Sequence, residues 1–329
     1  MSRKPQASVR RLALLLAAPF LLPADACAQA SYPEQTIKIV AGFPAGSAPD
    51  TTARLIAEKL QAAWGKPVVV ENLAGAGGNL AADRVAKSSP DGYTLLLAGN
   101  ASIVVNPSLY EKLPYDPIKD LVPIAQVTTT PNILVVHPDV PAKSVAELVA
   151  LARAQPDALT YGHGGVGISQ HLAGELFNHM AGIAVRPVGF RGATGVMPDL
   201  LAGRISMCFC NIVTVLPLAQ EGKLRALAVT ALKRSPAAAE LPTMDQSGFP
   251  GFDATAWFGL MAPAGTPEAI VAKLHGVVVQ ALASADTSAK LDAMGMVAIG
   301  NTPAAFAAVI KAEIPYWEAV IKTIGLKVK

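Results

Sequence analysis

Three glycines in the stretch YGHGGVGISQH, at Gly162, Gly164 and Gly167, have the spacing G-x-G-x-x-G between a short apolar run and an expected helix. In dinucleotide-binding proteins this turn holds a pyrophosphate on backbone amides, and an acidic residue about 20 positions later holds the ribose. Here the next expected strand is followed by Arg191 instead of an acid. We therefore expect no nucleotide and no other cofactor. The turn and the helix that begins near Ser169 are suited to a small anion instead.

A second turn of this kind lies in GFPAGSAPDTTAR, where Ser47 or Asp50 is placed to cap the helix that follows. Asp50 and Arg54 are four residues apart, which is the spacing of a local ion pair on a helix. Either turn by itself is explained by a tight connection between a strand and a helix. Two such turns in separate lobes favour a cleft that closes over a small carboxylate.

The histidines offer little for metal binding or catalysis. No two of them have the i, i+4 spacing of zincin helices, and the sequence has neither a G-x-S-x-G elbow nor a G-x-x-x-x-G-K-[ST] phosphate loop. We therefore predict no metal ligand and no catalytic residue. His163, inside the glycine turn, is expected to face the bound molecule. It keeps open one alternative, an exported α/β enzyme that acts on small organic acids.

The N-terminus is typical of an export signal. A basic start is followed by the apolar run LALLLAAPFLL, which is too short to span a bilayer, and then by Ala28-Gln29-Ala30, a small-x-small cleavage site. We predict a signal peptide over residues 1–30, cleavage near Ala30 and a periplasmic location. The remaining chain carries 23 basic and 23 acidic residues. Such a neutral body argues against nucleic acid or a membrane surface as a partner.

The cysteines do not suggest a metal site. Cys27 lies in the predicted signal peptide, in a context that meets the lipoprotein pattern poorly. Cys208 and Cys210 alternate on an expected strand, so that both side chains point to one face. A disulfide at that spacing is strained, and further metal ligands are not in sight. We expect two small buried apolar side chains.

The rest of the chain repeats a β-branched run, a glycine or proline turn and a helical stretch, which predicts an α/β fold with mostly parallel sheets flanked by helices. Such sheets bind ligands at the carboxyl ends of their strands. Polar, proline-rich segments at 123–138 and 226–244 indicate two crossings between lobes. We expect lobe 1 over 31–129 and 233–329, and an inserted lobe 2 over 130–232. The last helices each begin at a Thr-Pro pair, with the threonine as N-cap and the proline at the first helical position, and they return to cover lobe 1.

Taken together, the segments resemble the Bug-type solute receptors of the tripartite tricarboxylate transporters. The matching stretches follow one another in family order along nearly the whole chain after the signal peptide: YPEQTIKIVAGFPAGSAPDTTAR, VVVENLAGAGGNLAADRVAKSSPDGYTLLL, NPSLYEKLPYDPIKDLVPIAQV, YGHGGVGISQHLAGELF, GKLRALAVT and WFGLMAPAGTP. The resemblance implies a monomeric periplasmic binding protein of the two-lobed, type II-like Venus flytrap class. It would capture a small carboxylate and deliver it to membrane permease subunits. A sensor of the same fold is the alternative.

The resemblance also implies which residues contact the ligand. From lobe 1 these are Phe43, Ser47, Asp50, Asn100 and Ser102, and from lobe 2 they are His163, Gly164, Gly167, Ser169, His171, Arg191 and Asn211. Three positions depart from the family pattern: His163 replaces a small hydroxyl residue, Arg191 replaces a lysine or similar residue, and Cys210 replaces a frequent aspartate. Two added donors and one lost acid predict a ligand without an amino group.

Overall fold

The computed structural model describes Met1 and residues 32–328. Every helix and strand named below belongs to the unit Pro33–Lys329. The predicted signal peptide, its cleavage near Ala30 and the cysteine at position 27 lie outside the described residues. In the described part of the chain, no single helix has the length and apolar composition of a membrane span. One pair of consecutive helices, bent by 69°, meets those two criteria only when its members are taken together.

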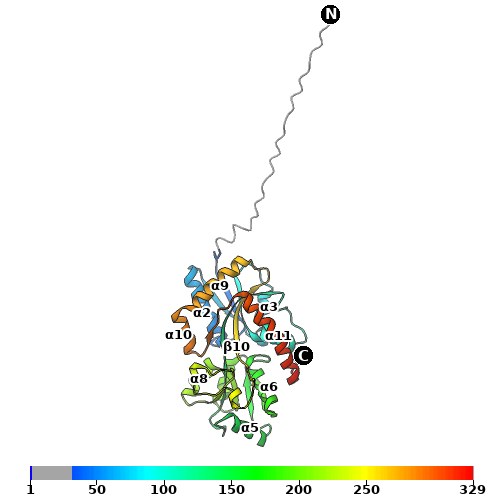
Figure 1. Ribbon diagram of the computed structural model, residues 1–329, viewed down its shortest axis with the longest axis vertical. Helices are drawn as coiled ribbons and strands as arrows, with labels where there is room; N and C mark the ends of the chain where they lie inside the picture. Colours follow the sequence, from blue (N-terminus) through cyan, green and yellow to red (C-terminus); the bar gives the residue numbers. More distant parts are fainter. Residues whose placement is uncertain (2–31, 329) are drawn as a thin grey trace. The chain divides into compact units, whose positions relative to one another are not determined.

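Pro33–Lys329 contains two sheets (Figure 1). The first has the order β11-β4-β10-β3-β1-β2, with β1 (Ile37–Ala41), β2 (Val68–Asn72), β3 (Thr94–Gly99), β4 (Leu121–Thr130), β10 (Ala256–Pro263) and β11 (Val297–Ala298). The second has the order β7-β6-β8-β5-β9, with β5 (Asn132–Val136), β6 (Thr160–His163), β7 (Arg186–Gly189), β8 (Met207–Asn211) and β9 (Arg225–Val229). The α/β fold with two sheets is as predicted, and the second sheet is inserted in the sequence of the first.

Both sheets are mixed, so the prediction of mostly parallel sheets is wrong for about half of the strand pairs. β1 runs parallel to β2 and β3, and β6 runs parallel to β7 and β8. By contrast, β10 is antiparallel to β3 and β4, β11 is antiparallel to β4, and β5 is antiparallel to β8 and β9. The chain crosses through Pro131 from β4 into β5 and returns from β9 to β10. A strand that the chain enters from the other sheet points away from that sheet. Its neighbours have their carboxyl ends directed toward the other sheet, so the pairing is antiparallel.

Helices cover both sheets (Figure 1). Around the first lie α2 (Ala48–Trp64), α3 (Asn79–Ala86), the π-helical turn η2 (Ala101–Val105), α4 (Asn106–Leu109), α9 (Glu268–Ala283), α10 (Ala285–Ala293) and α11 (Pro303–Ile324). Around the second lie α5 (Val145–Ala154), α6 (Ser169–Ala181), α7 (Met197–Leu201) and α8 (Ile212–Gln220). The short 3-10 turns are η1 (Ala76–Gly78), η3 (Ala193–Val196), η4 (Pro236–Ala238) and η5 (Asp245–Ser247). Both α9 and α11 pack against β4, so the C-terminal helices return to the first sheet as predicted.

The two Thr-Pro pairs behave differently. Thr302 caps α11, because its side-chain oxygen accepts the amide hydrogen of Ala305. Thr266 does not cap α9; its hydroxyl donates to the carbonyl oxygen of Pro263 at 2.7 Å, and the helix begins one residue later than predicted. The predicted cap is therefore correct only for α11, where the threonine side chain is free of a competing acceptor.

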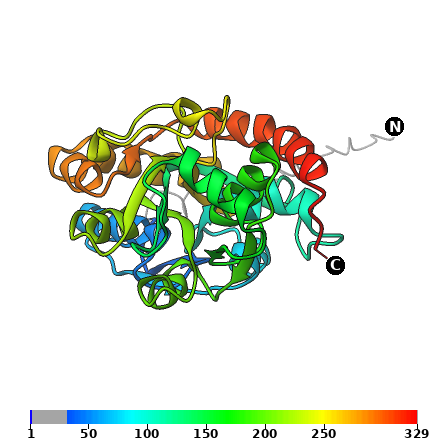
Figure 2. The ribbon, with the colours of Figure 1, turned by 90° about the horizontal axis from the view of Figure 1, so that it is seen from below.

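The two halves touch through their helices as well as through the crossing strands. Leu172 of α6 is fully buried in the core cluster of the first sheet, beside residues such as Leu109 and Ile310. In agreement with this, α6 packs against α11 (Figure 2). The loops at the carboxyl ends of the strands are therefore held close to one another across the space between the sheets.

Candidate functional site

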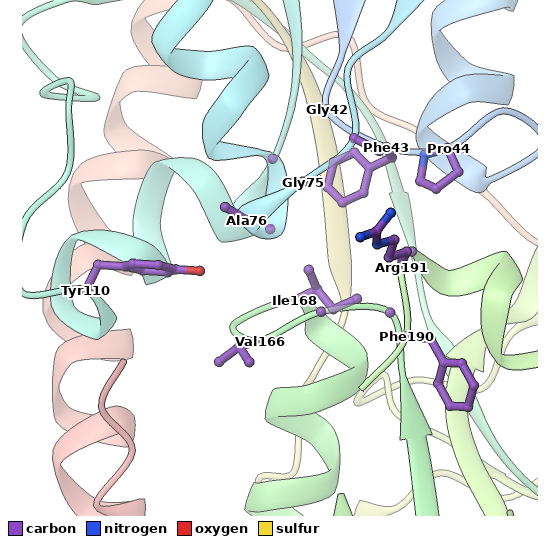
Figure 3. A pocket seen from close by; sticks show the side chains of 16 residues that line it. Gly42, Phe43, Pro44, Gly75, Ala76, Tyr110, Val166, Ile168, Phe190 and Arg191 are labelled. Carbon is purple, nitrogen blue, oxygen red and sulfur yellow. The ribbon is translucent and has the colours of Figure 1, made fainter. Parts of the chain in front are cut away.

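A cavity of about 490 Å³ lies between the loops of the two sheets (Figure 3). Its walls are the turns that follow β1, β2, β6 and β7, at the carboxyl ends of these strands, together with Tyr110. This is the edge at which parallel strands of α/β proteins bind ligands. The lining residues are Gly42, Phe43, Pro44, Ala74, Gly75, Ala76, Gly77, Gly78, Tyr110, Gly164, Gly165, Val166, Ile168, Phe190, Arg191 and Gly192.

Arg191 alone carries a charge among these lining residues, all of which belong to the described part of the chain. The backbone on each side of it is fixed, since the amide of Phe190 donates to the carbonyl oxygen of His163 at 2.8 Å and that of Gly192 to the carbonyl oxygen of Gly164 at 2.9 Å. Tyr110 directs its hydroxyl into the cavity from the side opposite Arg191 (Figure 3). The site therefore offers a guanidinium and a phenol at its two ends and apolar walls between them.

The amides of the glycine turn are already used within the protein. Gly164 N–H donates to Oε1 of Gln170 at 2.9 Å, and Gly167 N–H donates to Nδ1 of His171 at 3.3 Å. We expected these two amides to hold the ligand; in this structure each of them is already paired with a side chain of α6. Gly164 still lines the cavity, whereas Gly167 does not. The turn holds its shape because side chains at the start of α6 reach back to it.

His163 and His171 lie beneath this turn and not in the cavity. Both are buried, with 4% of each residue exposed, and their ring centroids are 4.3 Å apart. Burial lowers the pKa of His163, and burial together with the neighbouring His163 lowers the pKa of His171 to about 3. His163 was expected to face the bound molecule, but in this structure it is not among the residues that line the cavity. As neutral rings, the two histidines position the glycine turn.

The loop after β1 divides in the same way between lining and supporting residues. Phe43 forms a wall, as predicted. Ser47 donates its hydroxyl to the carbonyl oxygen of Pro44 at 2.6 Å. Asp50 accepts hydrogen bonds from the Gly46 amide and from Arg54, which confirms the local pair. Burial raises the pKa of Asp50, but these bonds outweigh burial and the net pKa is lowered.

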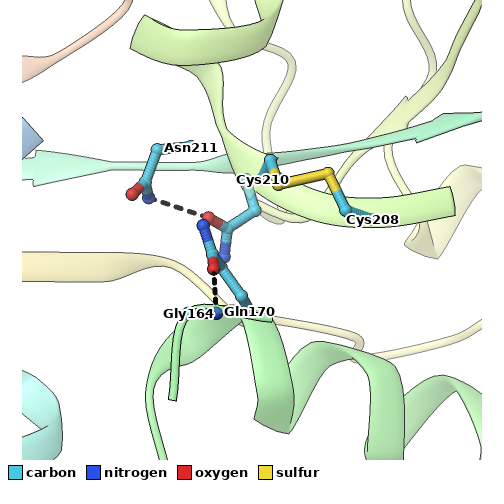
Figure 4. The surroundings of a disulfide bond; sticks show 6 residues. Gly164, Gln170, Cys208, Cys210 and Asn211 are labelled. Carbon is cyan, nitrogen blue, oxygen red and sulfur yellow. Dashed lines mark hydrogen bonds between the residues drawn. A yellow bond between two sulfur atoms is a disulfide. The ribbon is translucent and has the colours of Figure 1, made fainter. Parts of the chain in front are cut away.

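The other predicted ligand contacts lie behind the cavity wall. Ser102 donates its hydroxyl to the carbonyl oxygen of Gly99 at 3.2 Å, and Asn100 and Ser169 are buried. Asn211, at the end of β8, donates its Nδ2 to Oδ1 of Asn132 at 2.8 Å (Figure 4). None of these four side chains lines the cavity.

Cys208 and Cys210 form a disulfide on β8, next to Asn211 (Figure 4). The expectation of two separate thiols is therefore wrong. Alternation on the strand places both side chains on one face, as predicted, and the Cα atoms are 5.4 Å apart, which is within the range that a disulfide spans. Both residues are buried in a core cluster with Ile133 and Val135 of β5.

Two parts of the cavity are not among the predicted ligand contacts. The first is the loop from Ala74 to Gly78, although its glycine run between β2 and α3 is the same kind of turn as the other two. The second is Tyr110, because no motif around it in the sequence indicates that it lines a cavity. It is placed from a distance, because it forms a parallel bridge with Val328 near the C-terminus, whose amide donates to the carbonyl oxygen of Leu109 at 3.0 Å.

The loops meet at the edge of the cavity. A Cβ atom added to Gly192 would lie 2.2 Å from Cγ of Pro44, and one added to Gly77 would lie 3.2 Å from the carbonyl oxygen of Val166. Each pair joins a loop of the first sheet to a loop of the second. The described conformation is therefore one in which the two sets of loops are closed on each other.

Comparison with known proteins decides the family. The family described as the tripartite tricarboxylate transporter family receptor matches residues 52–326. The chain belongs to this family. BugT of Bordetella pertussis is 36% identical to this receptor over 300 residues, which are 91% of this chain and 92% of BugT. The predicted family and receptor class are thereby confirmed.

Solved structures agree with this assignment. A protein of R. palustris solved with adipate superimposes with a TM-score of 0.88 at 36% identity and covers 90% of the receptor chain and 99% of its own. MatC of Rhodopseudomonas palustris, with bound malate, gives a TM-score of 0.83 at 34% identity, with 88% of the receptor and 100% of MatC covered. The periplasmic binding protein BugD gives a TM-score of 0.86 at 33% identity, with 91% and 100% covered.

Proposed function

We propose that this receptor captures a small carboxylate without an amino group in the cavity between its two sets of loops. The observation that carries the proposal is the charge of the cavity wall: Arg191 is positive, and no described lining residue is an acid. A guanidinium binds a carboxylate through charge-assisted hydrogen bonds. A ligand amine would have no carboxylate to pair with among these residues.

The shape of the cavity favours an elongated acid. Arg191 and Tyr110 stand at opposite sides, and Phe43, Val166 and Ile168 form an apolar middle. A dicarboxylate with a methylene chain would place one carboxylate at Arg191, its chain on the apolar walls and its second carboxylate near the Tyr110 hydroxyl. The similarity to the adipate-bound protein of R. palustris supports this ligand class, and the malate-bound MatC supports a shorter one.

The remaining parts of the proposal concern what happens to the ligand. Closure of lobe 1 (31–129 and 233–329) on lobe 2 (130–232) presents the liganded receptor to permease subunits of the transporter, which accept the carboxylate. The receptor acts in the periplasm as a monomer, after cleavage near Ala30, and catalyses nothing. An enzyme would need a base in the cavity, and neither His163 nor any other described histidine lines it.

A thermal-shift screen of the mature protein, beginning at Ser31, tests the proposal. The ligands are adipate, malate, benzoate, aspartate and glutamate, with NAD as a control. Binding to the folded state alone adds about 2.7 kcal/mol at a hundredfold excess over the dissociation constant. We expect adipate to shift the unfolding midpoint. A receptor that binds aspartate or glutamate in preference to the other acids, or only NAD, contradicts the proposal.

The role of Arg191 is tested by calorimetry with adipate on Arg191→Gln. Loss of a hydrogen bond to a charged group costs about 1.5–3 kcal/mol, so the dissociation constant should rise roughly 10- to 150-fold. Arg186→Gln is the matched control, because Arg186 is also exposed and begins the strand that Arg191 follows. Equal affinities of the two variants would remove Arg191 from the site.

A further inference from the structure

A second cavity, of about 440 Å³, shares no lining residue with the first. It lies where β4, the segment that returns from β9 to β10, β10 itself and α11 meet. Its lining residues are Gln126, Thr129, Leu232, Gly251, Asp253, Thr255, Trp257, Glu313, Tyr316 and Trp317. Its wall thus combines two carboxylates with three aromatic rings, whereas the first cavity has a guanidinium and no acid.

Neither carboxylate is paired with a basic side chain in the described part of the chain. Among the ion pairs of the described residues, none involves Asp253 or Glu313. Glu313 accepts the indole N–H of Trp257 on Oε2 at 2.8 Å, and Asp253 accepts the amide of Thr255 on Oδ1 at 2.9 Å. The pKa of Glu313 is raised, mainly by burial and to a smaller extent by the charge of Asp253, although hydrogen bonds from Trp257 and Trp317 act in the opposite direction. Both acids therefore line the same cavity, and the charge of one affects the other.

The aromatic side chains complement this charge. Trp257 and Trp317 are buried, and Tyr316, with 46% of its surface exposed, packs edge to face against Trp317 at 5.2 Å. Aromatic rings attract a cation that lies over their faces, with tryptophan the strongest and organic ammonium groups the usual ligands. Two carboxylates close to each other repel, so a bound cation that neutralises them is energetically favourable.

We propose that this cavity binds a small organic cation, an alkylammonium or guanidinium group held between Asp253 and Glu313 against the aromatic wall. The volume is sufficient for a small molecule, and the exposed Gly251, Leu232 and Tyr316 mark the way in. The site is independent of the carboxylate cavity, since its charge has the opposite sign and no residue is shared.

Titration of tryptophan fluorescence tests this proposal directly, because Trp257 and Trp317 are two of the three tryptophans in the chain. The probe is n-butylammonium chloride at constant ionic strength, with sodium chloride and the neutral 1-pentanol as controls. We expect a saturable change with the ammonium salt and none with the two controls. Addition of adipate should not displace the cation, which separates this site from the carboxylate site.

Three variants decide whether the acids hold the cation. Glu313→Gln and Asp253→Asn remove charge but keep an oxygen that accepts the existing hydrogen bonds, and each should weaken butylammonium at least tenfold. Glu318→Gln is the matched control, because Glu318 is an exposed acid on the same helix and does not line the cavity. An unfolding midpoint is recorded for each variant, and Asp253→Asn suffices if the Glu313 variant does not fold. A non-saturable response, or equal affinity in all three variants, overturns the proposal.

Discussion

Replacing Gly192 by alanine tests whether the loops must close on each other to hold a ligand. Gly192 follows Arg191 and has φ +82° and ψ 162°, a region that is occupied almost only by glycine. Its Cα lies against Pro44 of the other sheet: an added methyl group would be 2.2 Å from Cγ and 2.7 Å from Cδ of that ring. The substitution therefore has a backbone cost in every conformation and a steric clash only in the closed one.

The size of the effect follows from this geometry. Carbon atoms in contact are optimally about 3.5–4.0 Å apart, so the two loops must separate by roughly 1 Å or more. Such a separation widens the cavity between Phe43 and Arg191. If closure becomes unfavourable by about 1.4–2.8 kcal/mol, the dissociation constant rises roughly 10- to 100-fold. Backbone strain alone, of order 1–3 kcal/mol, lowers stability without changing affinity.

The assay is calorimetric titration with adipate, together with the thermal unfolding midpoint of each variant. Gly222→Ala is the matched control: it lies in the same half, has φ +71°, and an added Cβ would meet nothing within 4 Å. We expect both variants to lose stability and only Gly192→Ala to lose affinity. If Gly192→Ala binds adipate as tightly as Gly222→Ala does, the contact with Pro44 plays no part in ligand capture and the reasoning fails.

Two further predictions concern α6, and Gly276 of α9 supplies the comparison for the second of them. Burial lowers the pKa of His171 from 6.5 to about 3, so between these pH values the unfolded chain binds more protons and the free energy of unfolding should fall as pH drops below 6.5. Urea unfolding at several pH values should show a weaker pH dependence of stability for His171→Gln than for the unmodified protein. An unchanged pH dependence would contradict the lowered pKa of His171. Gly174→Ala would place a methyl group 2.3 Å from the Tyr161 ring and should destabilise by about 1–3 kcal/mol. By contrast, Gly276→Ala in α9 meets nothing within 4 Å and should stabilise by up to about 1 kcal/mol, so equal unfolding midpoints for these two alanine variants would refute the packing argument.

The fold could be predicted because its signals are local. Strand, turn and helix alternate along the chain, and the cap at Thr302 follows from two adjacent residue types. The direction of β5 and β10 could not be predicted in this way. It depends on which sheet the chain leaves before it enters the strand, and the residues of β5 and β10 themselves do not show this. The same holds for Tyr110, whose place at the cavity is set by a bridge to Val328 at the far end of the sequence.

The site was predicted in position but less well in its contacts. Phe43, Gly164 and Arg191 line the cavity as expected, because each follows a strand at its carboxyl end. Ser47 and Asp50 occur in the same loops but bind backbone groups close to them. A short polar side chain in a glycine turn can reach nearby backbone groups, and because buried polar groups are unfavourable without hydrogen bonds, it pairs with them. Residue type and position cannot separate such a support from a ligand contact.

The difference between side chains that line the cavity and side chains that support its loops bears on which ligand the receptor selects. The turn after β6 has the anion-binding spacing, yet Gln170 and His171 occupy the amides of Gly164 and Gly167. Among the described residues of the proposed site, the only charge that favours an anion is therefore that of Arg191, outside the glycine motif, and we expect the apolar walls and Tyr110 to determine which acids bind. Chains with the same glycine spacing can accordingly hold different acids. The preference of the receptor among acids of different chain length should therefore change more on substitution of Tyr110 than on any change within the glycine motif.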